Sequence, residues 1–295
     1  MKSSNLADIS LSVIVPCFNE EDNLKFQVEA LLNESWDESW EVLLCDNGST
    51  DSTVKVIKRY SRNEDKIKYV DASKKKGVSY ARNRGVEEAQ GELIAFIDAD
   101  DIIATGWVPA IAEGIRLHSF VASKRDQFVN DNKVGNKINT KNPSKGLIQY
   151  NYVDYLPFSG GCGLGIRRKI HEKIGGFDEE LIYCEDTDYC WRVQLQGIPL
   201  IFWPKALVHV RTRESTMDLF RQGLNWGEYN ALLYKKFKPY GIPNVSYLRG
   251  IKLWVKLLRR IFFLWKKWQR DTFIKGLGYR IGMLKGSIRF RVFAP

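Results

Sequence analysis

The amino-acid sequence predicts an α/β fold built on a mostly parallel, doubly wound sheet. Three short apolar runs, Leu11–Val15, Glu41–Cys45 and Glu92–Ile97, have the length and composition of buried strands. Each run stops at polar or acidic residues, and segments with helical periodicity lie between and after the runs. Strands that alternate with helices in this way are typical of parallel sheets. The helices are expected at about residues 21–33, 51–61, 77–90 and 105–117.

Polar side chains suited to chemistry follow the ends of the three predicted strands. Asn19 follows the first strand, Asp46 and Asn47 follow the second, and Asp98 and Asp100 follow the third. In open α/β sheets, ligands bind outside the carboxyl ends of the strands. We therefore expect these side chains to collect at one acidic edge of the sheet.

The acidic run Asp98-Ala99-Asp100-Asp101 is the most informative feature of that edge. Carboxylates are seldom buried beside apolar strands unless they are paired or hold a metal ion. In extended backbone, Asp98 and Asp100 would point to the same side. Two hard oxygen ligands on one side suit Mg²⁺ or Mn²⁺. The alternative is an ordinary turn or helix-capping cluster after a strand.

The length and the cysteine content indicate a domain with a hydrophobic core rather than a small protein held together by zinc or disulfides. A chain of 295 residues can bury a full α/β core and carry an extension. The five cysteines are odd in number and form no C-x-x-C pair, so we expect reduced cytosolic thiols rather than zinc ligands or disulfides. The first apolar run is short, so no signal peptide is expected. Residues 126–146 are polar and are expected to form a long loop.

The net charge of +10 is distributed unevenly along the chain. Residues 231–295 contain 16 of the 45 Lys and Arg residues but one of the 35 acidic residues, so they carry +15 and the rest carries −5. A basic segment of this kind binds nucleic acid or an anionic membrane surface. No nucleic-acid motif accompanies the charge, so nucleic acid is not expected as a partner.

Apolar residues in the basic segment follow helical spacing, with lysines and arginines on much of the opposite side. This pattern is typical of helices that lie in a membrane interface. Lys256, Arg259 and Arg260 interrupt the apolar run, which falls short of the roughly 20 apolar residues that a spanning helix needs. The alternative is an ordinary helix that docks on the protein core. The apolar positions are Ile251, Trp254, Val255, Leu258, Ile261, Phe262, Trp265 and Trp268.

A second apolar stripe and a row of glycines follow in the same segment. Gly278, Gly282 and Gly286 recur every four residues, a spacing that lets another helix approach closely. Because glycine costs a soluble helix about 1 kcal/mol relative to alanine, a loosely helical, bent tail is the alternative. The stripe consists of Phe273, Leu277, Ile281, Leu284 and Ile288.

The order and spacing of these motifs resemble the inverting family 2 glycosyltransferases, which have the GT-A fold. The resemblance covers about residues 10–235, so we expect a GT-A domain over 1–240 and a basic amphipathic helical tail over 241–295, associated with a membrane. The matching pieces are Val13-Ile-Val-Pro-Cys-Phe-Asn-Glu20, Asp46-Asn-Gly-Ser-Thr-Asp51, Gly77-Val-Ser-Tyr-Ala-Arg-Asn-Arg-Gly85, Asp98-Ala-Asp-Asp101, Gly175-Gly-Phe-Asp178, Glu185-Asp-Thr-Asp188 with Arg192, and His209.

The resemblance implies a nucleotide-sugar donor, an acceptor hydroxyl and a divalent metal ion, Mg²⁺ or Mn²⁺. The metal ligands that it implies are Asp98, Asp100 and His209, although a lone histidine at a strand edge is more often structural. The family usually has two aspartates where this chain has Asp46 and Asn47, which leaves uridine, thymidine and guanosine donors open. The implied donor-binding residues are Pro16, Phe18, Asn19, Glu20, Asp46, Asn47, Arg82, Asp98 and Ala99.

Asp186 is the expected catalytic base, a choice that rests on its position in the family motif. Asp186 also opens a predicted helix, so the alternative is a cluster of capping carboxylates, which the helix N-terminus stabilises as anions. Glu185 and Asp188 are the second choices, and they are expected to contact the acceptor and to pair with Arg192 respectively.

Two further features complete the expected site. Arg82 is expected to contact the diphosphate or the base of the donor, and the alternative is a surface ion pair. The glycine-rich run Ser159–Gly165 is expected to form a floor where backbone comes close to donor and acceptor.

The leading hypothesis is a metal-dependent inverting glycosyltransferase at the cytoplasmic, inner face of the cell membrane. It would move a sugar from a nucleotide sugar to a hydroxyl of a lipid-linked or cell-surface saccharide. One alternative is a polyprenyl-phosphate glycosyltransferase, whose phosphate acceptor needs no base, but Glu185-Asp186 favours a hydroxyl acceptor. The other is a non-catalytic protein that binds a nucleotide sugar or nucleic acid. Retention of both acidic motifs argues against lost catalysis.

Overall fold

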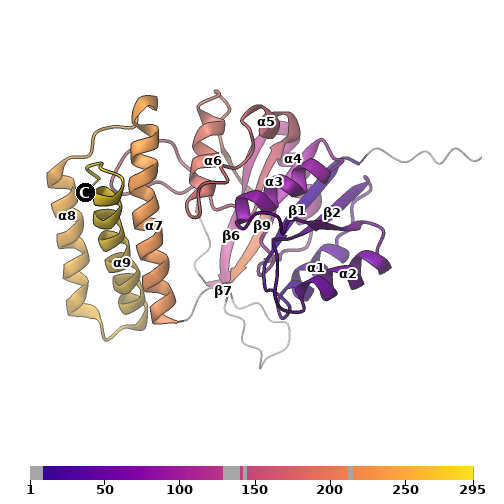
Figure 1. Ribbon diagram of the computed structural model, residues 1–295, viewed down its shortest axis with the longest axis horizontal. Coiled ribbons are helices and arrows are strands. Elements are labelled where there is room, and N and C mark those ends of the chain that lie inside the picture. The colour runs from indigo at the N-terminus through magenta and orange to yellow at the C-terminus, as the bar shows by residue number, and fades with distance from the viewer. Residues whose placement is uncertain (1–8, 129–139, 142–144, 212–214, 295) are drawn as a thin grey trace, which may run out of the picture. The chain divides into compact units, whose positions relative to one another are not determined.

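A computed structural model describes residues 9–128, 140–141, 145–211 and 215–294. The chain divides into two compact units, which we call unit 1 (residues 1–147 and 158–212) and unit 2 (148–157 and 213–295). Unit 1 contains the sheet, and the regular elements of unit 2 are helices (Figure 1).

The sheet of unit 1 has nine strands in the order β3-β2-β1-β4-β8-β6-β9-β5, with β7 paired to β6. Strands β3, β2, β1 and β4 are mutually parallel, as the alternating pattern predicts. Strand β8 then runs antiparallel between β4 and β6. The strands are β1 Leu11–Cys17, β2 Trp40–Asp46, β3 Ile67–Asp71, β4 Leu93–Phe96, β5 Ile102–Ile103, β6 Phe120–Phe128, β7 Thr140–Lys141, β8 Leu164–Arg167 and β9 Ile201–Arg211.

The four predicted helices of unit 1 are confirmed, with ends that differ from the prediction by a few residues. All residues of β2 and most of β1 are buried, because helices cover both faces of these strands and leave no side for alternating polar residues. The helices are α1 Leu24–Leu32, α2 Thr53–Asn63, α3 Val78–Glu88, α4 Trp107–His118, α5 Arg168–Lys173 and α6 Glu185–Gln194.

Gly85 allows α3 to pack directly against the sheet. A Cβ atom at this position would lie 2.4 Å from Cγ2 of Ile14 and 2.7 Å from Sγ of Cys45. The absence of a side chain therefore brings α3 close to β1 and β2. All five cysteines, Cys45 among them, are free and buried, which agrees with the expected absence of disulfides.

The polar segment 126–146 differs in part from the predicted loop. Strand β6 continues to Phe128, and Thr140–Lys141 form β7 on its edge. Residues 129–139 and 142–144, which also belong to the predicted loop, lie outside the described residues.

Unit 2 is built around two parallel helices that approach closely along glycines. Gly223 and Gly227 of α7 face Gly278, Gly282 and Gly286 of α9, and Cβ atoms on these glycines would lie 2.0–2.4 Å from backbone oxygens of the partner helix. The close approach predicted from the glycine spacing is therefore confirmed, and we call this contact the glycine seam. The helices are α7 Thr216–Phe237, η1 Lys238–Tyr240, α8 Tyr247–Leu258, η2 Arg259–Phe263 and α9 Lys267–Arg289.

The predicted apolar face of the tail is mostly exposed. Within α8, Gly250 and Leu257 are the buried residues, whereas Ile251 is 59% exposed and Phe262 of η2 is 73% exposed. Within unit 2, docking on a protein core therefore does not account for this face. In the second stripe, Ile288 is 82% exposed, because the glycines of α9, rather than this stripe, face α7. Among the described residues, no helix is long and apolar enough to cross a membrane.

Candidate active site

The loops that follow β1 and β2 are tied together by side-chain hydrogen bonds. Asn19, in the left-handed region at φ 55°, accepts a hydrogen bond from Thr50 N at 2.8 Å, and its own N–H donates to Ser49 Oγ at 3.0 Å. The buried carboxylate of Asp46 accepts a hydrogen bond from Gly48 N at 3.1 Å. The ends of two neighbouring strands thus form one braced edge, as the sequence predicted.

Asn47 uses its side-chain amide to shape the loop after β3. Nδ2 donates to the carbonyls of Ala72 and Lys75 at 2.7 and 2.8 Å, and Oδ1 accepts from Gly77 N at 2.7 Å. Both amide hydrogens are therefore engaged within the protein. The structure gives Asn47 a role in holding the loop that leads into α3, and its expected contact with a donor base stays a prediction.

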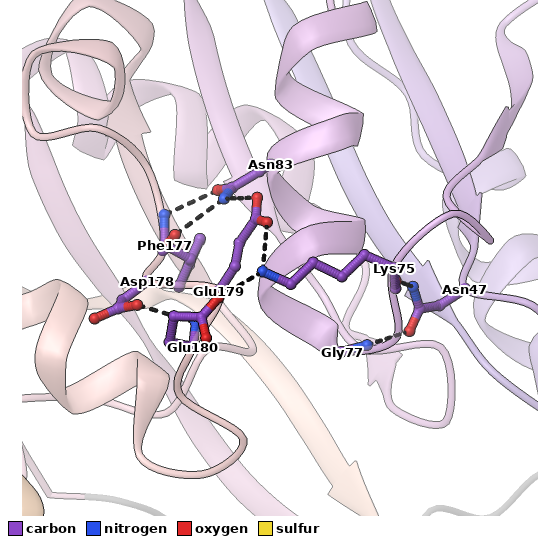
Figure 2. A network of polar contacts seen from close by, with 8 residues as sticks. All are labelled: Asn47, Lys75, Gly77, Asn83, Phe177, Asp178, Glu179 and Glu180. Atoms are coloured by element: carbon purple, nitrogen blue, oxygen red, sulfur yellow. Dashed lines mark hydrogen bonds and ion pairs between the residues drawn. The ribbon is translucent and has the colours of Figure 1, made fainter.

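A network of polar contacts continues from this loop toward the start of α6 (Figure 2). Lys75 Nζ pairs with Glu180 at 2.8 Å and with Glu179 at 3.3 Å. Asn83 of α3 accepts a hydrogen bond from Phe177 N at 2.8 Å and donates to Phe177 O at 3.0 Å. Residues 177–180 are thereby fixed against α3, and they precede the Glu185-Asp186 motif in the chain.

The remaining donor-binding residues predicted in unit 1 lie at the same strand ends. Pro16 is part of β1, and Phe18 just beyond it is 49% exposed. Burial raises the pKa of Glu20, and the negative charge of Asp100 raises it further, against a hydrogen bond from Asn23. Ala99 is buried in the core. The contacts of these residues with a donor stay predictions.

Arg82 is the central cation of the site. It is buried, and its guanidinium donates to Asp98 Oδ1 at 2.8 Å and to Glu185 Oε1 at 3.0 Å. The guanidinium also lies over the ring of Phe177, 5.1 Å from its centre. A Cβ atom on Gly161 would lie 2.4 Å from Arg82 Nη2, so this glycine makes room for the arginine. The alternative of a surface ion pair is therefore wrong.

The acidic run after β4 forms a turn, which corrects the extended conformation assumed from the sequence. Asp101 N donates to Asp98 O at 3.3 Å, so the chain folds back instead of alternating. The buried Asp101 carboxylate anchors the turn by accepting a hydrogen bond from Arg211 N at 3.0 Å. The turn brings a carboxylate oxygen of Asp101 within 4.8 Å of one of Asp98.

The donor atoms at this turn suit a cation. One ligand atom from each of Asp98, Asp101 and Cys162 lies within 4.8 Å of the others. Burial raises the pKa of Asp101 well above its usual range, and the charges of Asp98 and Asp100 raise it further. Asp98 is partly exposed and Asp101 is buried, and carboxylates that repel one another are stabilised by a bound cation, so these two residues fit the divalent ion that the motif implies. Burial raises the pKa of the Cys162 thiol, which makes it a poor ligand for Mg²⁺ or Mn²⁺.

Asp100 and His209 lie outside that three-residue group, and their expected role as metal ligands stays a prediction. His209 lies on β9, where its backbone pairs with Asp126 of β6. Burial lowers the pKa of His209, against the charge of Asp126, so the imidazole is neutral near pH 7. Within the part of the chain that the structure describes, buried Nδ1 has no hydrogen-bond partner. A neutral imidazole nitrogen of this kind is able to bind a metal ion.

Asp186 and Glu185 open α6 beside Arg82. Thr187 N donates to Asp186 Oδ1 at 2.7 Å, which is a local hydrogen bond at the helix start. Burial raises the pKa of Asp186, and burial together with the charge of Asp186 raises the pKa of Glu185 to about 7. A carboxyl with a raised pKa is a better proton acceptor when ionised. The expected role of Asp186 as base stays a prediction with this support.

Asp188 has a structural position. It is fully buried, and its Oδ2 accepts a hydrogen bond from Arg192 Nε at 2.6 Å, which is the expected pair. Arg192 also donates to the carbonyls of Ile174 and Gly176 at 2.9 and 2.8 Å. The pair thus fastens α6 to the segment before it, whereas Glu185 is linked to the acidic turn through Arg82.

Sequence reasoning missed two residues of this site. Asp101 was placed in the acidic run but was given no role, although its position directly after the D-x-D pair is a usable signal. The second residue is Arg125, whose Nη1 lies 2.4 Å from the point that a Cβ atom on Gly160 would occupy, a point 3.6 Å from Asp186 Oδ2. The sequence feature that could have indicated Arg125 is the charged run Lys124-Arg125-Asp126. This run directly follows the buried strand residues Phe120–Ala122, close to the position at which a loop was expected to begin.

Comparison with known proteins assigns the family. A sequence model described as Glycosyl transferase family 2 matches residues 12–175, which is more than half of the chain. The chain belongs to glycosyltransferase family 2. The matched region contains the edge built by Asn19, Asp46 and Asp98.

Curated proteins with glycosyltransferase names are similar to this chain in sequence. The chain is 26% identical over 187 residues to the UDP-Glc:alpha-D-GlcNAc-diphosphoundecaprenol beta-1,3-glucosyltransferase WfgD of Escherichia coli, covering 62% of this chain and 69% of WfgD. It is 22% identical over 244 residues to the poly-beta-1,6-N-acetyl-D-glucosamine synthase of Staphylococcus epidermidis, covering 77% of this chain and 56% of the synthase. The chain spans roughly half, or less, of the length of several curated relatives that it matches.

The GT-A fold expected from the sequence is also confirmed. The mannosyltransferase PcManGT of Pyrobaculum calidifontis, solved in complex with GDP-Man and Mn²⁺, superposes with a TM-score of 0.63 at 16% identity, covering 94% of this chain and 86% of that one. At this level of identity the likeness concerns the fold.

Proposed function

We propose that this family 2 glycosyltransferase moves a sugar, with inversion, from a nucleotide sugar to a hydroxyl of a lipid-linked or cell-surface saccharide. The observation that carries the proposal is the position of Arg82, which joins Asp98 of the acidic turn to Glu185 beside the candidate base. A donor site and a proton-accepting site are thus linked through one guanidinium. Both are needed for the transfer of a sugar to a hydroxyl.

The residues divide the chemistry between them. Inversion requires the acceptor oxygen to attack the anomeric carbon on the side opposite the departing diphosphate. Asp186 takes the proton from the attacking hydroxyl, and its raised pKa suits that task. Glu185, which accepts a hydrogen bond from Arg82, is the proposed contact with the acceptor. Asp98 and Asp101, with Cys162 close by, would hold a divalent ion that neutralises charge on the leaving phosphates.

The choice of substrates draws on the relatives. WfgD is named for a UDP-Glc donor and a diphosphoundecaprenol-linked acceptor, the synthase of S. epidermidis for a polysaccharide product, and PcManGT was solved with GDP-Man and Mn²⁺. We propose the same classes here, namely a nucleotide diphosphate sugar, Mg²⁺ or Mn²⁺, and a saccharide acceptor.

We also propose that unit 2 holds the enzyme on an anionic membrane at the cytoplasmic face. The exposed apolar stripe of α8 and η2, at Ile251, Val255, Leu258 and Phe262, is the basis of this proposal. Lysines and arginines of the same segment lie beside that stripe, and charge of this sign attracts anionic lipid headgroups. A surface of this kind would bring the enzyme to a lipid-linked acceptor.

Substitution of the candidate base tests the proposal. Purified protein is incubated with a panel of nucleotide sugars, Mn²⁺ and a lipid-linked saccharide, and nucleotide release and product stereochemistry are measured. Asp186→Asn is expected to lower the rate by about 10²–10⁴ while donor affinity stays unchanged. Asp65→Asn, which alters an exposed carboxylate, is the control. Normal turnover in Asp186→Asn would overturn the assignment of the base, and transfer to a polyprenyl phosphate by that variant would favour the alternative acceptor.

A further inference from the structure

Arg125 approaches the candidate base from a different side than Arg82. It lies on β6, two residues beyond a register shift between β6 and β9 at Ser123 and Lys124. Pro204 falls in the bulged part of β9, and its missing N–H cannot continue the ladder there. Pairing resumes with Lys124 opposite Leu207 and continues with Arg125 opposite Val208, and the Arg125 guanidinium reaches Gly160.

Gly160 provides the space in which the guanidinium and the base meet. A Cβ atom on Gly160 would lie 2.4 Å from Arg125 Nη1 and 3.6 Å from Asp186 Oδ2. Because both atoms approach this one point, the guanidinium and the carboxylate lie within about 6 Å of each other. At that range an opposite charge favours the ionised form of a carboxyl group.

The two oxygens of Asp186 have different surroundings. Oδ1 is held by Thr187 N at 2.7 Å, whereas Oδ2 is the oxygen that faces Gly160 and Arg125. Oδ2 is therefore the oxygen placed to take a proton, and Arg125 is the cation on that side. Arg82 holds the neighbouring Glu185 at 3.0 Å, so each carboxyl of the motif has a guanidinium near it.

We propose that Arg125 is a positioning residue that keeps Asp186 ionised with Oδ2 directed toward the acceptor, and that Gly160 is glycine in order to admit it. The proposal rests on the proposed function, because it assumes that Asp186 is the base. Burial raises the pKa of Asp186 and so disfavours its ionised form. The groups that act on it are Arg82 from α3 and Arg125 from β6, which lower its pKa, and Asp98 at the acidic turn, which raises it, with Glu185 and Cys190 nearby on α6.

Three variants test the proposal. Arg125→Gln removes the charge, Arg125→Lys keeps the charge without the planar fork, and Gly160→Ala places a methyl group where the guanidinium lies. Arg125→Gln is expected to lower kcat by about 10–100-fold with donor Kd unchanged, and to move the acidic limb of the pH–rate profile about one unit toward higher pH. Arg125→Lys should recover most of the activity, and Gly160→Ala should resemble Arg125→Gln. The control is Arg84→Gln, an arginine of α3 that pairs with Glu87 and Glu88 of its own helix.

A double-mutant cycle separates this role from a general loss of structure. If Arg125 acts through Asp186, then Arg125→Gln should cost no further activity in the Asp186→Asn background. An equal loss in both backgrounds would overturn the proposal, as would a wild-type kcat and pH profile in Arg125→Gln. Normal activity of Asp186→Asn alone would instead overturn the proposed function. An inactive Asp186→Asn beside a fully active Arg125→Gln would leave that function intact and exclude this role for Arg125.

Discussion

Arg82 pairs with Glu185 at 3.0 Å across 103 residues of sequence. The same guanidinium holds Asp98 at 2.8 Å, so it joins the acidic turn after β4 to the first residue of α6. Arg82 is buried, so the stability of the folded chain depends on the charge of the groups that surround its guanidinium. Removal of either partner therefore affects stability as well as chemistry.

Glu185→Gln is expected to stabilise the protein near neutral pH while it impairs activity. The pKa of Glu185 is raised to about 7 in the folded state, so from about pH 4.5 to about 7 the unfolded chain binds fewer protons and stability falls as pH rises. The glutamine amide does not ionise, so it removes this pH-dependent contribution to the free energy of unfolding. We expect a gain of about 1–3 kcal/mol in the free energy of unfolding at pH 8 and little gain at pH 4.5. Urea denaturation at both pH values measures it, and equal effects at both would contradict the prediction.

Mn²⁺ affinity should depend on the acidic turn. Asp98→Asn and Asp101→Asn each remove one charged oxygen ligand and are expected to lower Mn²⁺ affinity at least about 10-fold. Loss of a residue that only hydrogen-bonds to a metal ligand already lowers metal affinity by about that factor, so loss of a ligand should cost at least as much. Calorimetry on the free protein measures this without any turnover. Asp65→Asn is the matched control.

The same measurement assigns the two remaining ligand candidates. Asp100→Asn and His209→Ala lower Mn²⁺ affinity if those residues are ligands, as the sequence predicts. Chelation should abolish transfer, and Mg²⁺ or Mn²⁺ should restore it. Full turnover in excess chelator, or unchanged Mn²⁺ binding in Asp98→Asn, would exclude a metal site at this turn.

Binding to anionic vesicles should have a part that depends on salt and a part that resists it. The charge variant Lys252→Gln, Lys256→Gln and Arg259→Gln should lose the first part, at about 1 kcal/mol per charge at low salt. The apolar variant Ile251→Ser, Val255→Ser and Phe262→Ser should lose the second. Flotation with neutral and anionic liposomes at two salt concentrations separates the two.

The control for flotation removes the same charge from unit 1, at Lys55, Lys58 and Arg62 of α2. That variant should float like the wild type. If the wild type stays in the soluble fraction with anionic liposomes at low salt, the membrane proposal is wrong.

The glycine seam predicts an unusual sensitivity to a single methyl group. A Cβ atom at position 282 would lie 2.0 Å from Leu224 O, a backbone atom that cannot yield without moving α7. At Gly276 the nearest atom, at 2.8 Å, is the side-chain end of Leu257. Gly282→Ala should therefore destabilise unit 2 by about 1–3 kcal/mol, whereas Gly276→Ala should be near neutral because alanine favours helix. Equal denaturation midpoints for both variants would contradict this prediction.

Features that depend on local pattern could be predicted from the sequence. The gathering of Asn19, Asp46 and Asp98 follows from the geometry of parallel strands, whose carboxyl ends share an edge. The close approach of α9 to another helix follows from the spacing of its glycines, since the absence of a side chain is a property of each position alone. The partner of that approach, α7, could not be named because two distant segments determine it.

Features that depend on long-range register could not be predicted. The position of Arg125 follows from the pairing of β6 with β9 after a bulge, and nothing near residue 125 encodes that pairing. The turn at Asp98–Asp101 depends on Arg211 N, which lies 110 residues away and holds the Asp101 carboxylate. Without that contact, an extended D-x-D was the natural expectation.

The interrupted path of the chain through unit 2 has a consequence for its synthesis. Residues 148–157 belong to unit 2, and Tyr152 is buried there with its hydroxyl donating to Asn230 Oδ1 at 3.3 Å. These ten residues leave the ribosome well before α7, α8 and α9 are synthesised. Their apolar side chains therefore stay exposed while unit 1 folds, because the helices that bury them are not yet present. A nascent or truncated chain that ends before α7 would present this segment to chaperones or to other chains. In a tail deletion, aggregation through residues 148–157 would be mistaken for a change in membrane binding. Point substitutions on α8 leave the segment covered and avoid this ambiguity.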